Sequence, residues 1–234
     1  MQPHRFRLLV FDVDGTLVDS QAAIVAAMNR TFDALGLPPP APAQTRRVVG
    51  LSLEEAVARL LPPDAGPALI ARAAQHYKNA FYTARHEPGY AEPLFPDVAE
   101  TLPQLNHPQV CLGIATGKSR RGLMATLAHH GLSAHFVTLQ TADGGHGKPH
   151  PRMLHDAMLD VGAEPDETLV IGDTVFDMEM AQSAGTPALG VGWGYHDAAE
   201  LTAAGAQRIL DRFAELPNVL EELSRTCASD DRAG

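Results

Sequence analysis

Two aspartates, Asp12 and Asp14, stand at the end of the apolar run Leu8–Phe11 and are followed by Gly15 and Thr16. Carboxylates that share one site raise each other's pKa unless a cation lies between them. Oxygen ligands favour a hard cation, and Mg²⁺ takes few carboxylates together with water and substrate phosphate. One carboxylate could also attack phosphorus and form an acyl-phosphate, while the second protonates the leaving oxygen. Two acids at this spacing suit metal-assisted phosphoryl transfer if other segments complete the site.

Three further segments carry polar residues where a predicted strand ends or a helix begins. Thr116 and Gly117 follow one strand, Asp173 follows another, and Lys148 lies in the loop GGHGKPHP before a helix. In an open parallel sheet, ligands bind at the carboxyl ends of the strands. We therefore expect these residues to meet Asp12 at one rim. Asp173 would join the first two aspartates around Mg²⁺, and the lysine and the hydroxyl would hold phosphate oxygens.

Short apolar runs alternate with amphipathic stretches through the second half of the chain. Strands are expected over residues 6–12, 109–115, 135–140, 168–172 and 188–191, and helices over residues 119–131, 151–161 and 175–185. A further helix is expected after Asp97, but Pro103 lies inside it and argues against a regular helix there. This alternation predicts an α/β fold, a Rossmann-like, mostly parallel sheet with helices on both faces.

No strand candidate interrupts residues 20–86, where three helical patterns follow one another. One apolar stripe runs from Ile24 to Leu35, Ser52 begins a second helix as a capping residue, and a third stripe runs from Leu69 to Ala84. We predict a small α-helical cap, residues 20–87, inserted into a catalytic core of residues 1–19 and 88–226. The polar residues 227–234 are expected to form a flexible tail.

Composition narrows the function classes. The 234 residues carry a net charge of −10, which argues against nucleic acid or an anionic membrane as the main partner. A small phosphorylated metabolite remains compatible, because a local cation or metal reverses the sign at one pocket. Cys111 and Cys227 lie far apart, so a reducing compartment is expected. With no apolar stretch of about 20 residues and no signal-peptide pattern, we expect a soluble cytoplasmic protein.

Four stretches carry a family resemblance: FDVDGTLVDS, IATGKS, GKPHP and GDTVFDMEMA. In this order and spacing they resemble the four motifs of the haloacid dehalogenase superfamily, and the helical insertion resembles the cap of its phosphoglycolate phosphatase-like group. The resemblance covers almost the whole chain. It implies that Asp12 is the nucleophile and that Asp14 is the general acid and base.

The same resemblance implies the binding residues. Thr116, Gly117 and Lys148 would contact the phosphoryl group. Mg²⁺ would be held by Asp173, by the Asp12 side chain and by the main-chain carbonyl of Asp14. Asp177 would support either the metal or Lys148.

One position near the site departs from that group. Gly117 stands where members often carry asparagine, so only a backbone N–H is offered there. Lys118, Arg120 and Arg121 come next and are interpreted as the solvated start of a helix.

The leading hypothesis is a Mg²⁺-dependent phosphatase acting on a small phosphomonoester such as phosphoglycolate. Asp14 argues against a dehalogenase, because a leaving halide needs no proton. A phosphohexose mutase stays open, because RRVVGLSLEEAV, residues 46–57, resembles the cap segment that such mutases place over the substrate. A non-catalytic protein that keeps a pocket for Mg²⁺ and phosphate is the third alternative.

Overall fold

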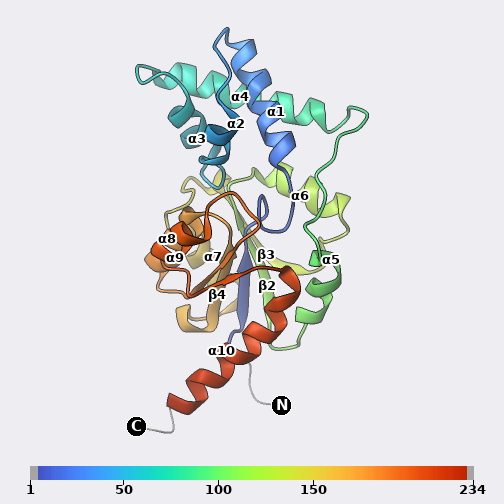
Figure 1. Ribbon diagram of the computed structural model, residues 1–234, viewed down its shortest axis with the longest axis vertical. Coiled ribbons are helices and arrows are strands. Elements are labelled where there is room, and N and C mark those ends of the chain that lie inside the picture. Colours follow the sequence, from blue (N-terminus) through green and yellow to red (C-terminus); the bar gives the residue numbers. More distant parts are fainter. Residues whose placement is uncertain (1–4, 231–234) are drawn as a thin grey trace.

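A parallel sheet forms the centre of the molecule in the computed structural model, which describes residues 5–230 (Figure 1). In this part of the chain the sheet has six strands in the order β3-β2-β1-β4-β5-β6. The strands are β1 Leu8–Phe11, β2 Cys111–Thr116, β3 Phe136–Thr141, β4 Thr168–Gly172, β5 Ala188–Val191 and β6 Arg208–Leu210. Leu8 aligns with Cys111 on one side and with Thr168 on the other, which puts β1 between β2 and β4.

Helices cover both faces of this sheet, which explains why the inner strands are apolar on both sides. They are α5 Val98–Thr101, α6 Arg120–His129, α7 Arg152–Val161, α8 Val175–Ala184, α9 Ala198–Ala203 and α10 Leu216–Asp230. Side chains alternate along β1: Leu9 and Phe11 pack with residues of α5, α6 and α10, whereas Leu8 and Val10 pack with residues of α7, α8 and α9. The predicted α/β fold is confirmed.

The other four helices lie beyond the carboxyl ends of the strands, at the top of Figure 1. They are α1 Gln21–Ala34, α2 Pro42–Arg46, α3 Leu53–Leu60 and α4 Pro67–Ala84. Buried side chains of α1, α3 and α4 form a separate apolar cluster that includes Met28, Phe32, Val57 and Ala73. Helices α1–α4 lie within residues 20–87, and the boundaries of the cap stay a prediction.

The structure corrects several predicted elements. The proline-rich loop after α1 contains the short helix α2, and the chain after Val191 adds α9 and β6, which were not predicted. The helix after Asp97 ends at Thr101 and continues as a 3-10 segment, Leu102–Leu105, because Pro103 cannot donate a backbone hydrogen bond.

The end of the chain also differs from the prediction. Helix α10 runs to Asp230 and so includes residues 227–230 of the predicted tail, whose flexibility stays a prediction. Residues 231–234 lie outside the described part. Within residues 5–230, no helix combines the length and the apolar character that crossing a bilayer requires.

Candidate active site

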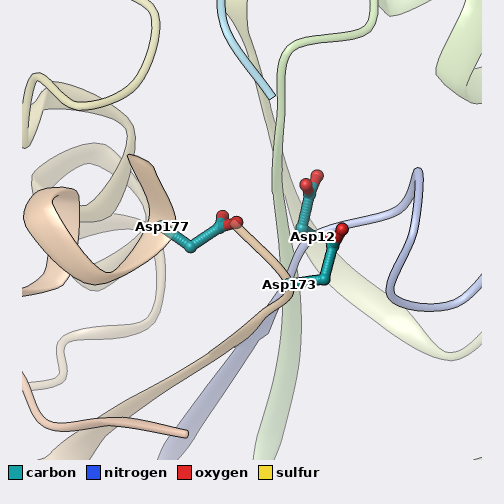
Figure 2. Close-up of side chains that lie close together, drawn as sticks. All are labelled: Asp12, Asp173 and Asp177. Carbon is teal, nitrogen blue, oxygen red and sulfur yellow. The ribbon is translucent and has the colours of Figure 1, made fainter. Parts of the chain in front are cut away.

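Three aspartates meet at the carboxyl end of the sheet (Figure 2). Asp12 follows β1, Asp173 follows the neighbouring strand β4, and Asp177 lies in the first turn of α8. All three are buried, and one carboxylate oxygen of each lies within 4.8 Å of the others. Adjacent parallel strands end at the same edge, so the topology itself brings Asp12 and Asp173 together. The predicted convergence of these two residues is confirmed.

Burial and crowding both act on these carboxyl groups. Burial raises the pKa of Asp12 to about 7; Lys148 lowers it, while Asp177 and Asp14 raise it. The pKa of Asp173 lies well above its ordinary value, chiefly because of burial and then because of repulsion from Asp12 and Asp177. The three carboxylates therefore carry more negative charge than the buried lysine beside them, Lys148, can neutralise.

The side chain of Lys148 is completely buried. Its Nζ lies 2.9 Å from Oδ2 of Asp12 and 2.6 Å from Oδ1 of Asp177. Burial alone would lower the pKa of Lys148, but the two carboxylates raise it above its usual range, so the amine is charged. The second oxygen of Asp177 accepts hydrogen bonds from the backbone N–H and the hydroxyl of Thr174, at 3.1 and 2.7 Å. In this structure Asp177 thus holds Lys148.

The donor set fits Mg²⁺. Oδ1 of Asp12 is buried and has no hydrogen-bond partner. Asp173 is held in place by the hydroxyl of Thr16, which donates to Oδ1 at 2.8 Å, and by the backbone N–H of Tyr195, which donates to Oδ2 at 3.0 Å. A side chain at Gly15, whose φ is +89°, would begin 2.1 Å from that Oδ2. Two oriented carboxylates with an unpartnered buried oxygen are the hard ligands that Mg²⁺ prefers.

Asp14 has a different environment from Asp12. Its Oδ1 lies 2.8 Å from Nζ of Lys118 and accepts a hydrogen bond of 2.5 Å from the Ser20 hydroxyl. Its side chain is not a member of the three-aspartate cluster, which agrees with a ligand role for its main chain only. Asp12 and Asp14 nevertheless both line one cavity of about 660 Å³. Two carboxylates in separate surroundings can take separate chemical roles.

Thr116 and Gly117 line the same cavity, as predicted. Thr116 is buried, and its hydroxyl accepts a hydrogen bond of 3.3 Å from the backbone N–H of Lys118. A Cβ placed on Gly117 would lie only 2.4 Å from the carbonyl oxygen of Leu51. The cap loop of residues 50–52 therefore rests directly on the backbone of Gly117, and this close approach requires glycine.

Comparison with known proteins identifies the family that this arrangement of site residues belongs to. A model of the family described as haloacid dehalogenase-like hydrolase matches residues 9–191. The chain belongs to the haloacid dehalogenase-like hydrolase family. A probable phosphatase IndB of Dickeya dadantii (strain 3937) is 35% identical to this chain, and the match covers 95% of this chain and 96% of that protein. A phosphoglycolate phosphatase of Vibrio vulnificus (strain CMCP6) is 28% identical, and the match covers 94% of this chain and 98% of that protein.

Solved structures agree with this assignment. A putative haloacid dehalogenase-like hydrolase from Bacteroides fragilis superposes with a TM-score of 0.82 at 28% identity, over 90% of this chain and 99% of that chain. The predicted membership of this superfamily, and with it the prediction of a hydrolase, is confirmed. The roles of the individual residues stay predictions.

Sequence reasoning misjudged Lys118 and missed Glu92 in this haloacid dehalogenase-like site. Lys118 was expected in solvent, but its side chain is 8% exposed and bridges Asp14 and Glu92. Glu92, in the segment that returns from the cap, also forms a 3.1 Å ion pair with Arg85. The result is a largely buried row of alternating charges that connects the end of α4 to the site: Arg85, Glu92, Lys118 and Asp14.

Glu92→Gln is expected to lower the free energy of unfolding by about 1–3 kcal/mol, because the buried Lys118 side chain and the partly buried Arg85 lose their shared anion. Burial opposes the charged form, but Lys118, the Tyr90 hydroxyl and Arg85 together hold the pKa of Glu92 below 4.5. A depressed folded pKa contributes stability above the unfolded value and loses it as pH falls through the folded value. The difference from wild type should therefore be full above about pH 5 and shrink in acid.

Urea unfolding at several pH values measures this difference, with Glu100→Gln as the control. Glu100 is exposed on α5, so its replacement should change little. Equal stability of Glu92→Gln and wild type at pH 7 would remove Glu92 from the buried network.

Gly117→Ala is expected to lower kcat/KM about ten-fold or more, because the new methyl group would meet the backbone of residues 50 and 51 and displace the cap loop from the site. Gly144→Ala is the matched control, since a Cβ there meets nothing within 4 Å. Phosphate release and thermal unfolding should be measured together. If Gly117→Ala kept wild-type kinetics, contact between the cap loop and Gly117 would be irrelevant to turnover.

Proposed function

We propose that this protein is a Mg²⁺-dependent phosphatase that hydrolyses a small phosphomonoester through an aspartyl-phosphate. The observation that carries the proposal is the position of Asp12. Its carboxylate lines the cavity, lies 2.9 Å from the buried amine of Lys148, and retains one oxygen without a hydrogen-bond partner. Such a carboxylate is confined, paired with a cation and free to attack.

In the proposed first step an oxygen of Asp12 forms a bond to phosphorus, and the bond from phosphorus to the leaving oxygen breaks. Asp14 donates a proton to that oxygen, so the alcohol leaves neutral. Asp14 then takes a proton from water, which attacks the phosphorus and releases phosphate and the free Asp12 carboxylate. Thr116, the backbone N–H of Gly117 and Lys148 hold the phosphoryl oxygens.

The metal would be held by Asp12, Asp173 and the main-chain carbonyl of Asp14. When bound, Mg²⁺ supplies positive charge that offsets the crowded carboxylates and the phosphate. Lys148 favours the ionised form of Asp12 through its ion pair, and Asp177 fixes Lys148 in that position. Thr16 and the backbone of Tyr195 orient Asp173.

The named relatives support this reading. They are called a probable phosphatase and a phosphoglycolate phosphatase, and a further relative, from Oceanobacillus iheyensis at 28% identity, is called pyrophosphatase PpaX. All three names describe cleavage of a phosphate bond. A phosphorylated small-molecule partner agrees with these names and stays a prediction, as does a cytoplasmic location.

A phosphate-release screen over metabolite phosphates, with Mg²⁺ and with excess chelator, tests the proposal. We expect release that depends on Mg²⁺ and that returns when the metal is restored. Glucose 1-phosphate with a sugar bisphosphate primer is included, because an isomeric sugar phosphate in place of free phosphate would identify a mutase. Binding of Mg²⁺ and phosphate analogues without turnover of any ester would instead identify a binding protein.

A further inference from the structure

The cavity above Asp12 and Asp14 is much larger than a phosphoryl group needs. Its volume of about 660 Å³ lies within the range of roughly 300–1,000 Å³ that is usual for sites of drug-sized ligands. It lies between α1–α4 and the loops at the carboxyl ends of the strands. The phosphoryl group would occupy the floor beside Asp12, which leaves most of the space to the leaving group.

The wall on the cap side is mostly apolar. It includes side chains from α1, from the segment after α2 and from α4, namely Ile24, Met28, Val48, Val49, Tyr77 and Phe81. Ile24, Met28 and Val48 are buried. Tyr77 is partly buried, and desolvation raises the pKa of its hydroxyl well above the ordinary value. An apolar wall of this kind binds by removing apolar surface from water.

The cations around the cavity are already paired with carboxylates of the protein. Lys118 lies 2.8 Å from Asp14, and Lys78 lies 3.2 Å from Glu54. Arg85 is paired with Glu92, as described above. Among the described lining residues, Arg121 is the one guanidinium without a carboxylate partner, and it is exposed and stacked over the ring of Tyr82 at 4.4 Å.

A carboxylate on the leaving group would therefore find no spare cation in the buried part of the cavity. It would also approach Asp14 and Glu54, which line the cavity, and burying an unpaired charge beside like charges is costly. A neutral leaving group with an apolar body avoids both costs and covers the apolar wall.

We propose that the physiological ester of this enzyme has a neutral, largely apolar alcohol as its leaving group, larger than glycolate, and that the cap wall around Val49 selects it. This inference rests on the proposed phosphatase function. It assigns a substrate class that differs from the phosphoglycolate indicated by the sequence resemblance.

Three alkyl phosphates with comparable leaving oxygens test this class: 2-phenylethyl phosphate, ethyl phosphate and phosphoglycolate. We expect kcat/KM for 2-phenylethyl phosphate to exceed both others about ten-fold or more, because only its ring covers the apolar wall. Val49→Asp should bring the ratio between the phenylethyl and ethyl esters close to one, whereas Val49→Leu should keep it. Because the ratio is internal to each variant, a general loss of activity does not affect it. Equal or better turnover of phosphoglycolate by the wild type would overturn the proposal.

Acetyl phosphate separates failure of this inference from failure of the phosphatase proposal, since its acetyl group needs little of the cavity. Mg²⁺-dependent turnover of acetyl phosphate without any preference for the phenylethyl ester rejects only the leaving-group class. If acetyl phosphate is not turned over, calorimetry with Mg²⁺ still tests the wall. Tighter binding of 2-phenylethylphosphonate than of ethylphosphonate, by about ten-fold, would support it, and equal binding would reject it.

Discussion

Asp12→Asn is expected to abolish phosphate release, with kcat lowered about 10³-fold or more, because an amide of the same size cannot form the acyl-phosphate. The replacement removes one negative charge from the cluster but leaves Lys148 paired with Asp177 at 2.6 Å. The fold should therefore survive. A malachite-type phosphate assay in saturating Mg²⁺ measures the loss, and thermal unfolding confirms that the protein is folded.

Binding provides the second readout for this variant. Inorganic phosphate should still bind in the presence of Mg²⁺, because Thr116, Lys148 and Asp173 remain. Asp19→Asn is the matched control, since Asp19 belongs to the same segment but is exposed, and its side chain accepts a hydrogen bond from the backbone N–H of Gln21. Wild-type turnover by Asp12→Asn would exclude Asp12 as the nucleophile and end the proposed mechanism.

The sequence was sufficient for the centre of the fold. The apolar runs that became β1, β4 and β5 are continuous because helices cover both faces of the sheet, so their pattern is strong. Polar residues directly after β1 and β4 then had to meet at one rim. The edge strand β6, Arg208–Leu210, is only three residues long, with one buried side chain, and it carries no comparable pattern.

The neighbours of Asp14 could not be predicted in the same way. Ser20 lies in the first motif and could have been suspected from its spacing. The burial of Lys118 depends on the cap, since the ring of Phe81 in α4 covers its Nζ at 5.1 Å. Glu92 lies in a segment with prolines and no periodicity. Its role follows from two ion pairs that exist only when α4, the returning segment and the loop after β2 are packed together.

Gly117 shows how a departure from the family pattern acquires a structural reason. In the sequence, Gly117 was notable only because members of the group often carry asparagine at this position. In the structure that absence admits the carbonyl of Leu51, and the buried face of the cap segment then packs on Phe176 through Val48, Leu51 and Ala56. Closure of the cap and the shape of the cavity beneath it are thus linked at this residue.

Lys148→Ala is expected to affect stability and turnover together. Lys148 is the cation between Asp12 and Asp177, and both of these carboxylates are 1% exposed. Removing one partner of a buried ion pair typically costs about 3–5 kcal/mol, which for a chain of this length corresponds to a fall in Tm of about 10 °C. Turnover should fall as well, because the phosphoryl group loses a binding cation and Asp12 loses the charge that favours its ionised form.

The dependence of this loss on pH and on charge distinguishes it from a simple packing defect. Burial already raises the pKa of Asp12, and removing Lys148 takes away the charge that lowers it. The variant should therefore lose more stability at pH 8 than at pH 5, where protonation of Asp12 relieves the repulsion. Lys148→Ala combined with Asp177→Asn should unfold at a higher temperature than Lys148→Ala alone, yet remain slow, because the neutral amide relieves the charge but holds no phosphate. If Lys148→Ala kept the wild-type Tm and kcat/KM, the amine would lie outside the active site. That result would also contradict the convergence of chain segments on which the mechanism depends.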